Sequence, residues 1–192
     1  SQLMANLEYL CDMIGPRLTG SPGLDKASHW TLEKFKQYGL SNPHLESWKI
    51  HRGWTRGLAK GRVVSPTEQR LILESAGWSI STPGDKPVRG PVVSLSTDND
   101  SDLASYKGKL KGAWIIRGAV SEQPSPKKPN AAGGSARTSV EVKKFLAEEG
   151  AAGLLRDSDK EHGLVNMTAA AYNFTPSIVP EAFLTTESYG LI

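Results

Sequence analysis

Residues 140–157, VEVKKFLAEEGAAGLLRD, decide the fold class of this chain of 192 residues. The first half carries apolar side chains at helical spacing, with Val140, Phe145 and Leu146 on one side. Gly150 supplies a C-terminal stop, and the apolar run 151–155 that follows has the length of a short strand. The segment therefore predicts a helix, a turn and a strand.

Residues 112–118, GAWIIRG, form a second apolar run of strand length, one loop before this helix. Two strands joined through a helix are typical of a parallel crossover, whose sheet is covered on both faces. Alternating or apolar runs predict further strands at residues 44–52, 57–64, 69–74, 88–95 and 178–184. The chain is therefore expected to be a mixed, β-rich α/β protein.

The N-terminal part is predicted to be helical. Apolar residues recur at helical spacing over residues 3–14, and Gly15-Pro16 ends this helix because proline forces the preceding residue toward extended geometry. Ser21 can cap a second helix, and Pro22 can occupy its first turn. The buried side of that helix is expected to hold Ala27, Trp30, Thr31, Phe35 and Tyr38, and Gly39 fits its C-terminal cap.

Two shorter helical segments are expected in the rest of the chain. Residues 101–106 fit one helical turn, and Thr185-Thr186-Glu187 resembles a cap that starts a helix at Tyr189. Residues 121–135 carry three prolines, two glycines and no periodicity. We expect the longest loop there, and long loops often carry function.

The composition narrows the classes of function. With 38% hydrophobic and 22% charged residues, the chain has a globular composition. The net charge of +3 is only mildly basic, and basic residues do not interleave with aromatic ones, so nucleic acid is not an expected partner. No apolar run approaches the ~20 residues that cross a bilayer, so a membrane is not expected either.

The single cysteine and the tryptophans are interpreted as structural. Cys11 repeats the apolar stripe of helix 3–14, so we expect a buried thiol rather than a nucleophile. The tryptophans are spread through different predicted elements, which favours core anchors over one stacking platform. They are Trp30, Trp48, Trp54, Trp78 and Trp114.

The histidines and paired glutamates do not form a zinc motif. A zinc hydrolase needs three or four histidine or carboxylate ligands and a carboxylate base. No histidine lies in a helical pair or a His-x-Asp arrangement, so surface or hydrogen-bonded roles are favoured for His29, His44, His51 and His162. Glu148-Glu149 has no histidine nearby and is interpreted as a solvated helix end.

Nucleophile and anion motifs are equally weak. Neither Gly20-Ser21-Pro22-Gly23 nor Gly133-Gly134-Ser135 has the Gly-x-Ser-x-Gly pattern of a nucleophile elbow. Gly133-Gly134-Ser135 lies before a predicted helix and offers backbone amides to an anion, but it lacks the lysine of a phosphate loop. We therefore assign no catalytic, cofactor-binding or metal-ligating residue to this chain.

Several strings resemble one known family. They include IGPRLTGS at residues 14–21, KGKLKGAWIIRG at 107–118 and FLAEEGAAGLLRDS at 145–158. Shorter matches are Arg52-Gly53-Trp54, Gly77-Trp78-Ser79, Thr82-Pro83-Gly84 and the closing Pro180-x-x-x-Leu184-Thr185-x-Glu187. Together they resemble the N-terminal part of zinc-dependent exopeptidases related to bacterial leucyl aminopeptidase and plasma glutamate carboxypeptidase.

The resemblance implies a domain organisation and a metal. Residues 1–50 would be helices of an incomplete catalytic domain, residues 51–185 a protease-associated (PA) domain with a swivelling β/β/α architecture, and residues 186–192 the return into the catalytic domain. In the family, histidines and carboxylates of the catalytic domain bind a pair of zinc ions. No residue of this chain matches the motifs that contain those ligands. The resemblance also implies a secreted or periplasmic protein whose signal peptide has been removed.

Two functions follow as hypotheses from this resemblance. In the first, the chain is a non-catalytic fragment of an aminopeptidase or carboxypeptidase, and its PA domain is a lid that controls substrate access. Its partners would be its own downstream catalytic domain and peptide substrate. In the alternative, the chain is an autonomous peptide-binding, protein-binding or dimerisation module, with homo-oligomers as the assembly.

Overall fold

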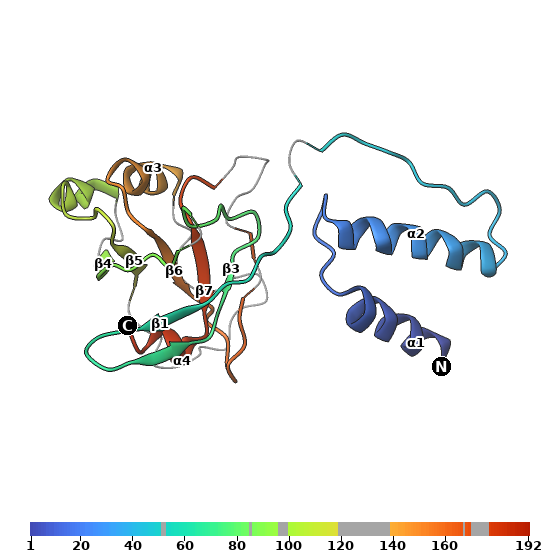
Figure 1. Ribbon diagram of the computed structural model, residues 1–192. Coiled ribbons are helices and arrows are strands. Elements are labelled where there is room, and N and C mark those ends of the chain that lie inside the picture. Colours follow the sequence, from blue (N-terminus) through green and yellow to red (C-terminus); the bar gives the residue numbers. More distant parts are fainter. Residues whose placement is uncertain (51–52, 85, 96–99, 119–138, 167, 170–176) are drawn as a thin grey trace. The chain divides into compact units, whose positions relative to one another are not determined.

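The computed structural model describes the chain except for residues 51–52, 85, 96–99, 119–138, 167 and 170–176. The chain divides into two compact units, Ser1–Arg56 and Gly57–Ile192 (Figure 1). The first unit is helical and the second is built on β-sheet. The predicted mixed, β-rich α/β class is confirmed.

The first unit begins with a helix that changes its winding. The α-helix α1 (Gln2–Glu8) continues directly into the π-helical segment η1 (Tyr9–Ile14), and Gly15 follows at a φ of 75°. The helix predicted over residues 3–14 is confirmed, but its wider second half was not predicted. The ring of Tyr9 stacks on Trp30 of the next helix, with 5.2 Å between the ring centroids.

The second helix, α2 (Pro22–Gln37), begins and ends as its sequence predicts. The Oγ of Ser21 accepts a hydrogen bond of 3.2 Å from the backbone N–H of Leu24, and Pro22 is the first helical residue. Gly39 follows the helix at a φ of 74°, a left-handed conformation that suits glycine.

Several predictions of burial in the first unit are wrong. Ala27 is buried, but Phe35 and Tyr38 are 43% and 46% exposed. Cys11 is exposed rather than buried, and the proposed core anchor Trp48 is 70% exposed. The common reason is that two helices and one extended segment cannot enclose all the apolar side chains that their periodicity places on one side.

The strand predicted at residues 44–52 is not present over residues 44–50, which form no β-ladder. Residues 51–52 lie outside the described part of the chain. The alternation of apolar and polar side chains is real, but a strand also needs a neighbour to pair its backbone groups. Among the described residues of the first unit no such neighbour occurs.

The second unit contains a ribbon and a larger sheet. The ribbon pairs β1 (Gly61–Val63) with β2 (Gln69–Leu71) in antiparallel orientation. The five-stranded sheet has the order β3-β7-β6-β5-β4. Strands β4 to β7 run parallel, and β3 is antiparallel to β7. Their bounds are Leu73–Ser75, Val92–Leu95, Trp114–Arg117, Gly153–Asp157 and Glu181–Leu184 for β3 to β7.

The predicted crossover forms the centre of this sheet. Strand β5 leads to helix α3 (Val140–Glu148), whose N-terminus is capped by the Oγ of Ser139. Gly150, at a φ of 70°, turns the chain into β6, which pairs with β5 in parallel. All the residues of β6 are buried, as a strand covered on both faces requires.

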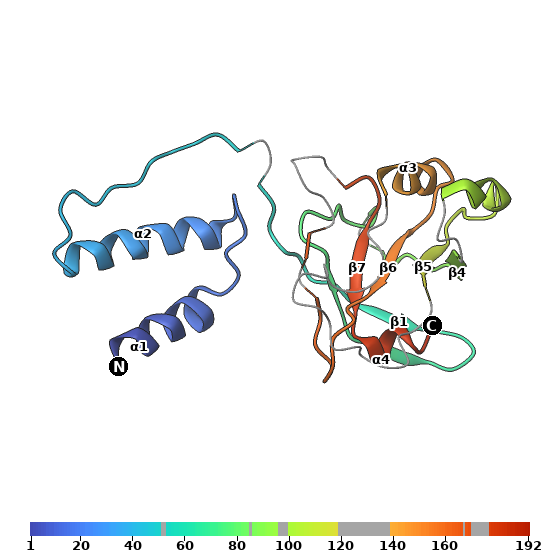
Figure 2. The same ribbon diagram turned by 180° about the vertical axis from the view of Figure 1, so that it is seen from behind.

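Two apolar clusters cover opposite faces of the sheet. On one face, Val142 and Leu146 of α3 pack with Leu154 of β6 and with side chains near the 3₁₀-helix η2 (Asp100–Tyr106). On the other face, Leu155 and Leu184 pack with Tyr189 of α4 (Thr186–Tyr189). Both views show α3 on one side of the sheet and α4 with β1 on the other (Figures 1 and 2).

Some boundaries in the second unit differ from the prediction. The run 69–74 is divided between β2 and β3, so that one apolar stretch serves two sheets. The turn predicted at 101–106 is confirmed as η2. The last helix begins at Thr186 rather than Tyr189, because the Oγ1 of Thr185 already caps it by accepting from the N–H of Ser188 at 3.2 Å. No described helix is long and apolar enough to cross a membrane.

Candidate functional site

The described histidines make local contacts. His29 Nδ1 lies 3.0 Å from the carbonyl oxygen of Asp25, one helical turn earlier. His44 Nδ1 lies 2.9 Å from the carbonyl oxygen of Asn42 and its Nε2 lies 3.3 Å from Glu46, and these hydrogen bonds raise the pKa of His44. His162 lies 3.5 Å from Glu161. His51 falls outside the described residues.

Among the described residues, no group of three or more histidine, cysteine, aspartate or glutamate side chains is arranged to hold a metal ion. Glu148 is exposed, but Glu149 is half-buried and accepts a hydrogen bond of 2.5 Å from the backbone N–H of Gly108. The interpretation of a solvated helix end did not include this contact of Glu149. The loop 121–135, with Gly133-Gly134-Ser135, lies outside the described residues.

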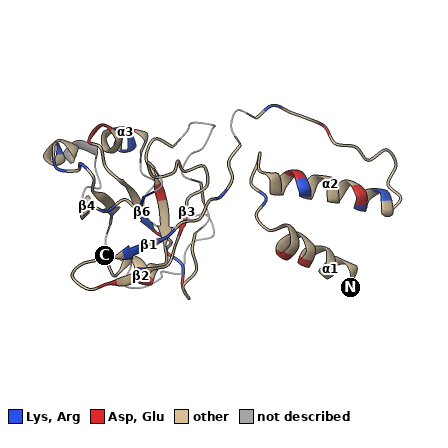
Figure 3. Cartoon of the chain, in the orientation of Figure 1, with Lys and Arg blue, Asp and Glu red and all other residues tan. Residues whose placement is uncertain are grey.

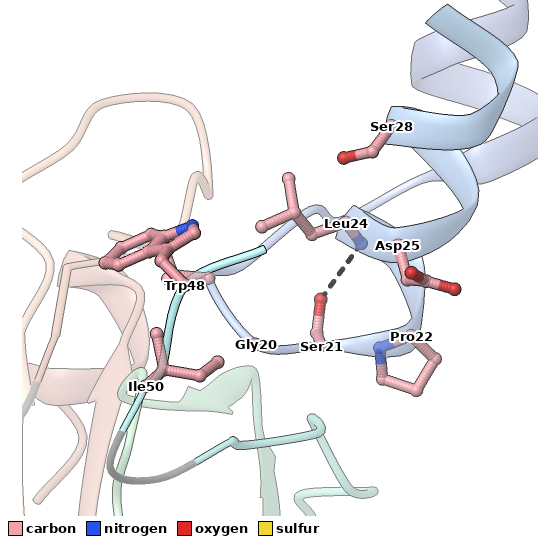
Figure 4. A pocket seen from close by; sticks show the side chains of 9 residues that line it. Gly20, Ser21, Pro22, Leu24, Asp25, Ser28, Trp48 and Ile50 are labelled. Atoms are coloured by element: carbon pink, nitrogen blue, oxygen red, sulfur yellow. Dashed lines mark hydrogen bonds between the residues drawn. The ribbon is translucent and has the colours of Figure 1, made fainter. Parts of the chain in front are cut away.

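A hollow of about 390 Å³ opens at the start of α2 (Figure 4). Gly20 and the capping Ser21 form its floor, and the side chains of Trp48 and Ile50 line the opposite wall. Among the described residues that line it, Asp25 is the one acidic side chain. These residues offer an apolar wall and a helix N-terminus, but they include no pair of groups for acid–base or nucleophilic chemistry.

A second, more apolar groove of about 450 Å³ runs beside the same helix. Its lining includes the apolar side chains of Leu10, Leu24, Phe35 and Leu45 and the basic side chains of Arg17 and His44. Further apolar side chains of this unit are exposed on α1 and η1, where Leu3, Met4, Leu7 and Met13 are 75%, 58%, 50% and 65% exposed. The first unit thus presents an extended apolar surface.

The second unit contains a buried charge cluster that sequence reasoning missed. Glu181, the first residue of β7, has a side chain that is 0% exposed. Its Oε1 lies 2.5 Å from the Nζ of Lys143 on α3, and its Oε2 lies 3.9 Å from the Nη1 of Arg156 on β6. An acidic residue inside the apolar run 178–184 was the signal that could have indicated it.

Burial has the largest effect on the pKa of Glu181 in this cluster. Enclosure raises the pKa of the Glu181 carboxyl, whereas Lys143, Arg156 and the hydroxyl of Ser177 act in the opposite direction. The guanidinium of Arg156 also lies over the ring of Phe183, 4.7 Å from its centroid. Figure 3 shows that helix α3, which supplies Lys143, carries both acidic and basic residues.

A second buried polar network lies where the parallel strands end. Asp157, at the end of β6, accepts hydrogen bonds from the hydroxyl of Thr186 and the N–H of Asp159. The hydroxyl of Tyr189 donates to the carbonyl oxygen of Arg117 at 2.9 Å and accepts from its N–H at 3.1 Å. These contacts hold α4 to the ends of β5 and β6, which makes the network structural.

No family model matches the chain. In a comparison of sequences, it is 38% identical over 105 residues to carboxypeptidase Q from Mus musculus, covering 54% of this chain and 22% of that protein. It is 33% identical over 105 residues to carboxypeptidase Q from Homo sapiens, with the same coverage. In a comparison of structures, it matches a peptidase M28 precursor from Shewanella amazonensis with a TM-score of 0.61 and 22% identity.

The chain is thus similar to carboxypeptidase Q in sequence and to M28 peptidases in fold. The structural match to the Shewanella peptidase covers 98% of this chain and 42% of that one. A zinc aminopeptidase from Bacillus subtilis has the same fold over 97% of this chain and 39% of its own, with a TM-score of 0.55 and 13% identity. The chain spans about a fifth of the length of the carboxypeptidase Q relatives.

Proposed function

We propose that this chain is the N-terminal part of a zinc-dependent exopeptidase, with the unit Gly57–Ile192 acting as its PA domain. The observation that carries the proposal is the 38% identity to carboxypeptidase Q over 105 residues. The similarity of the fold to that of a zinc aminopeptidase also supports the proposed exopeptidase family. The parent protein would be secreted or periplasmic.

In this proposal peptide hydrolysis takes place in a downstream catalytic domain that binds a pair of zinc ions. Zinc there would activate water and polarise the scissile carbonyl. In this proposal the present chain would contribute no ligand and no catalytic group. Its first unit would instead be part of that domain, which fits the exposed apolar side chains of α1 and η1. The downstream domain is thus the proposed partner that covers them.

The PA domain is proposed as a lid or access element for peptide substrate. Its sheet is rigid, since β6 is buried throughout and α3 and α4 cover its two faces. A rigid scaffold of this kind suits loops that contact a substrate. The alternative is that the chain is a separate peptide-binding or dimerisation module, and the exposed apolar surface of the first unit favours pairing between copies in that case.

One set of proteins tests these functions. The parent reading frame, the 192-residue chain and a parent lacking residues 57–185 are purified, and zinc content and hydrolysis of dipeptides and longer peptides are measured. The proposal expects zinc and hydrolysis in the parent, neither in the 192-residue chain, and altered KM for longer peptides in the shortened parent. Stoichiometric zinc and hydrolysis by the 192-residue chain would contradict it. Peptide affinity or stable dimers of that chain would support the alternative.

A further inference from the structure

The charge cluster at Glu181 joins three elements of the second unit. Lys143 comes from α3, Arg156 from β6 and Glu181 from β7. The register pairs Arg156 with Phe183, and Glu181 lies two residues before Phe183 on the same face of the sheet. This face is the one that α3 covers, so the carboxylate lies between helix and sheet.

The two oxygens of the Glu181 carboxylate have unequal surroundings. Oε1 lies 2.5 Å from Lys143 Nζ and accepts a longer hydrogen bond of 3.4 Å from the hydroxyl of Ser177. Oε2 is buried, and no described residue donates a hydrogen bond to it. The guanidinium of Arg156 lies 3.9 Å from Oε2 and also lies over the Phe183 ring.

A carboxylate in this position is poorly solvated when it is ionised. Full enclosure removes its water, and one hydrogen-bonded oxygen replaces only part of that solvation. The neutral acid loses less on burial, whereas the side chain of Lys143 is 13% exposed and so keeps part of its contact with solvent. Burial accordingly raises the pKa of Glu181 despite its two cationic neighbours.

The groups that face Glu181 come from every element packed against it. Among the described residues they are Lys143 of α3, Arg156 of β6, the hydroxyl of Ser177, and Ser79, whose Oγ accepts from the backbone N–H of Glu181 at 2.8 Å. One further carboxylate belongs to the same face, because Glu74 of β3 lies opposite Phe183 in the register.

We infer that Glu181 is a proton-responsive element of the fold, and that proton uptake by its carboxyl stabilises the folded state of the second unit. The sign follows from linkage, since a carboxyl that binds protons more tightly in the folded state stabilises that state on acidification. The stabilisation is complete below the pKa of the unfolded chain and is lost as the pH rises through the folded value. Each unit between the two pKa values changes the folding equilibrium about tenfold.

The experiment titrates the 192-residue chain directly. Carboxyl carbons of glutamate are followed by NMR from about pH 4 to about pH 8, a range that spans ordinary and raised carboxyl pKa values. The midpoint of Glu181 is expected to exceed the ordinary value of a glutamate carboxyl. An equal or lower midpoint for Glu181 would overturn the inference without any variant being needed.

Variants then connect the titration to stability. Glu181→Gln mimics the neutral acid, so its unfolding free energy relative to wild type should rise with pH, by about tenfold in the equilibrium constant per unit of raised pKa. Glu148→Gln, at an exposed position on α3, is the control variant for the loss of one glutamate. Glu74→Gln removes the neighbouring carboxylate and so tests whether that charge influences Glu181. The titration midpoint of Glu181 should remain raised in this variant. A pH-independent difference between Glu181→Gln and wild type would refute the inference.

Discussion

The hydroxyl of Thr186 donates a 2.7 Å hydrogen bond to the Oδ1 of Asp157, and this contact ties the first turn of α4 to the end of β6. Asp157 is buried, with 5% of its surface exposed. Thr186→Val keeps the shape of the side chain and removes the donor, so we expect a loss of about 1–3 kcal/mol in unfolding free energy. Urea unfolding followed by circular dichroism measures it. Thr67→Val, at an exposed position, is the matched control and should cost less than about 0.5 kcal/mol.

Tyr189 gives a prediction in alkaline solution. Burial is the main cause that raises the pKa of its phenol, the charge of Asp157 adds to it, and the hydrogen bond to Arg117 opposes it. A raised folded pKa means that the contribution to stability is present below about pH 10 and is lost as the pH rises through the folded value. Thermal unfolding should therefore show wild type losing its advantage over Tyr189→Phe at high pH. A constant difference across the range would show that Tyr189 does not ionise on unfolding.

Gly153 is expected to tolerate no side chain. A Cβ at this position would lie 2.7 Å from the carbonyl oxygen of Pro180 and 2.6 Å from the ring of Trp114. Gly153→Ala should therefore destabilise the sheet by about 1–3 kcal/mol or more, because strand backbone must move. Gly57→Ala meets no atom within 4 Å and serves as the control. Equal melting temperatures for the two variants would contradict this expectation.

At the N-cap of α3, only a side chain that can accept a hydrogen bond should replace Ser139 without loss of stability. Ser139→Ala removes the oxygen that accepts from the N–H of Val142 at 3.2 Å, at a cost of about 1 kcal/mol. Ser139→Asp supplies a new acceptor and should restore most of that stability. Amide hydrogen exchange of α3 measures both, and equal protection in the two variants would argue against the role of the cap.

The apolar surface of the first unit should control association. Leu7→Gln reduces it at a side chain that is already 50% exposed, so the helix should persist while binding of a hydrophobic dye falls. Leu58→Gln, in the second unit at 83% exposure, is the matched control. Light scattering over a range of concentrations should show weaker self-association for Leu7→Gln alone. Equal association of both variants would assign the contact to another surface.

Local patterns predicted the elements whose ends are marked by the sequence. Ser21 and Pro22 begin α2, and Gly150 ends α3, because each signal acts within one turn of the backbone. The parallel pairing of β5 with β6 followed from two apolar runs separated by a helix. These features need no knowledge of distant contacts.

Features that depend on distant partners were missed. The alternation around Trp48 resembles a strand, but pairing is decided by neighbours that the local pattern does not contain. The burial of Glu181 depends on Lys143, 38 residues earlier in the chain, and on Arg156 from another strand. A single acidic residue in an apolar run indicates an unusual position, but only the tertiary structure identifies its partners.

The pairing of β3 with β7 has a consequence for how this unit can be cut and rejoined. The chain enters the five-stranded sheet at one edge through β3, and it leaves through β7, the antiparallel neighbour of that strand. Entry and exit therefore lie beside each other, while β6, β5 and β4 extend away from them. A circular permutant that links these neighbouring ends and opens the chain elsewhere would keep every strand pairing of the sheet.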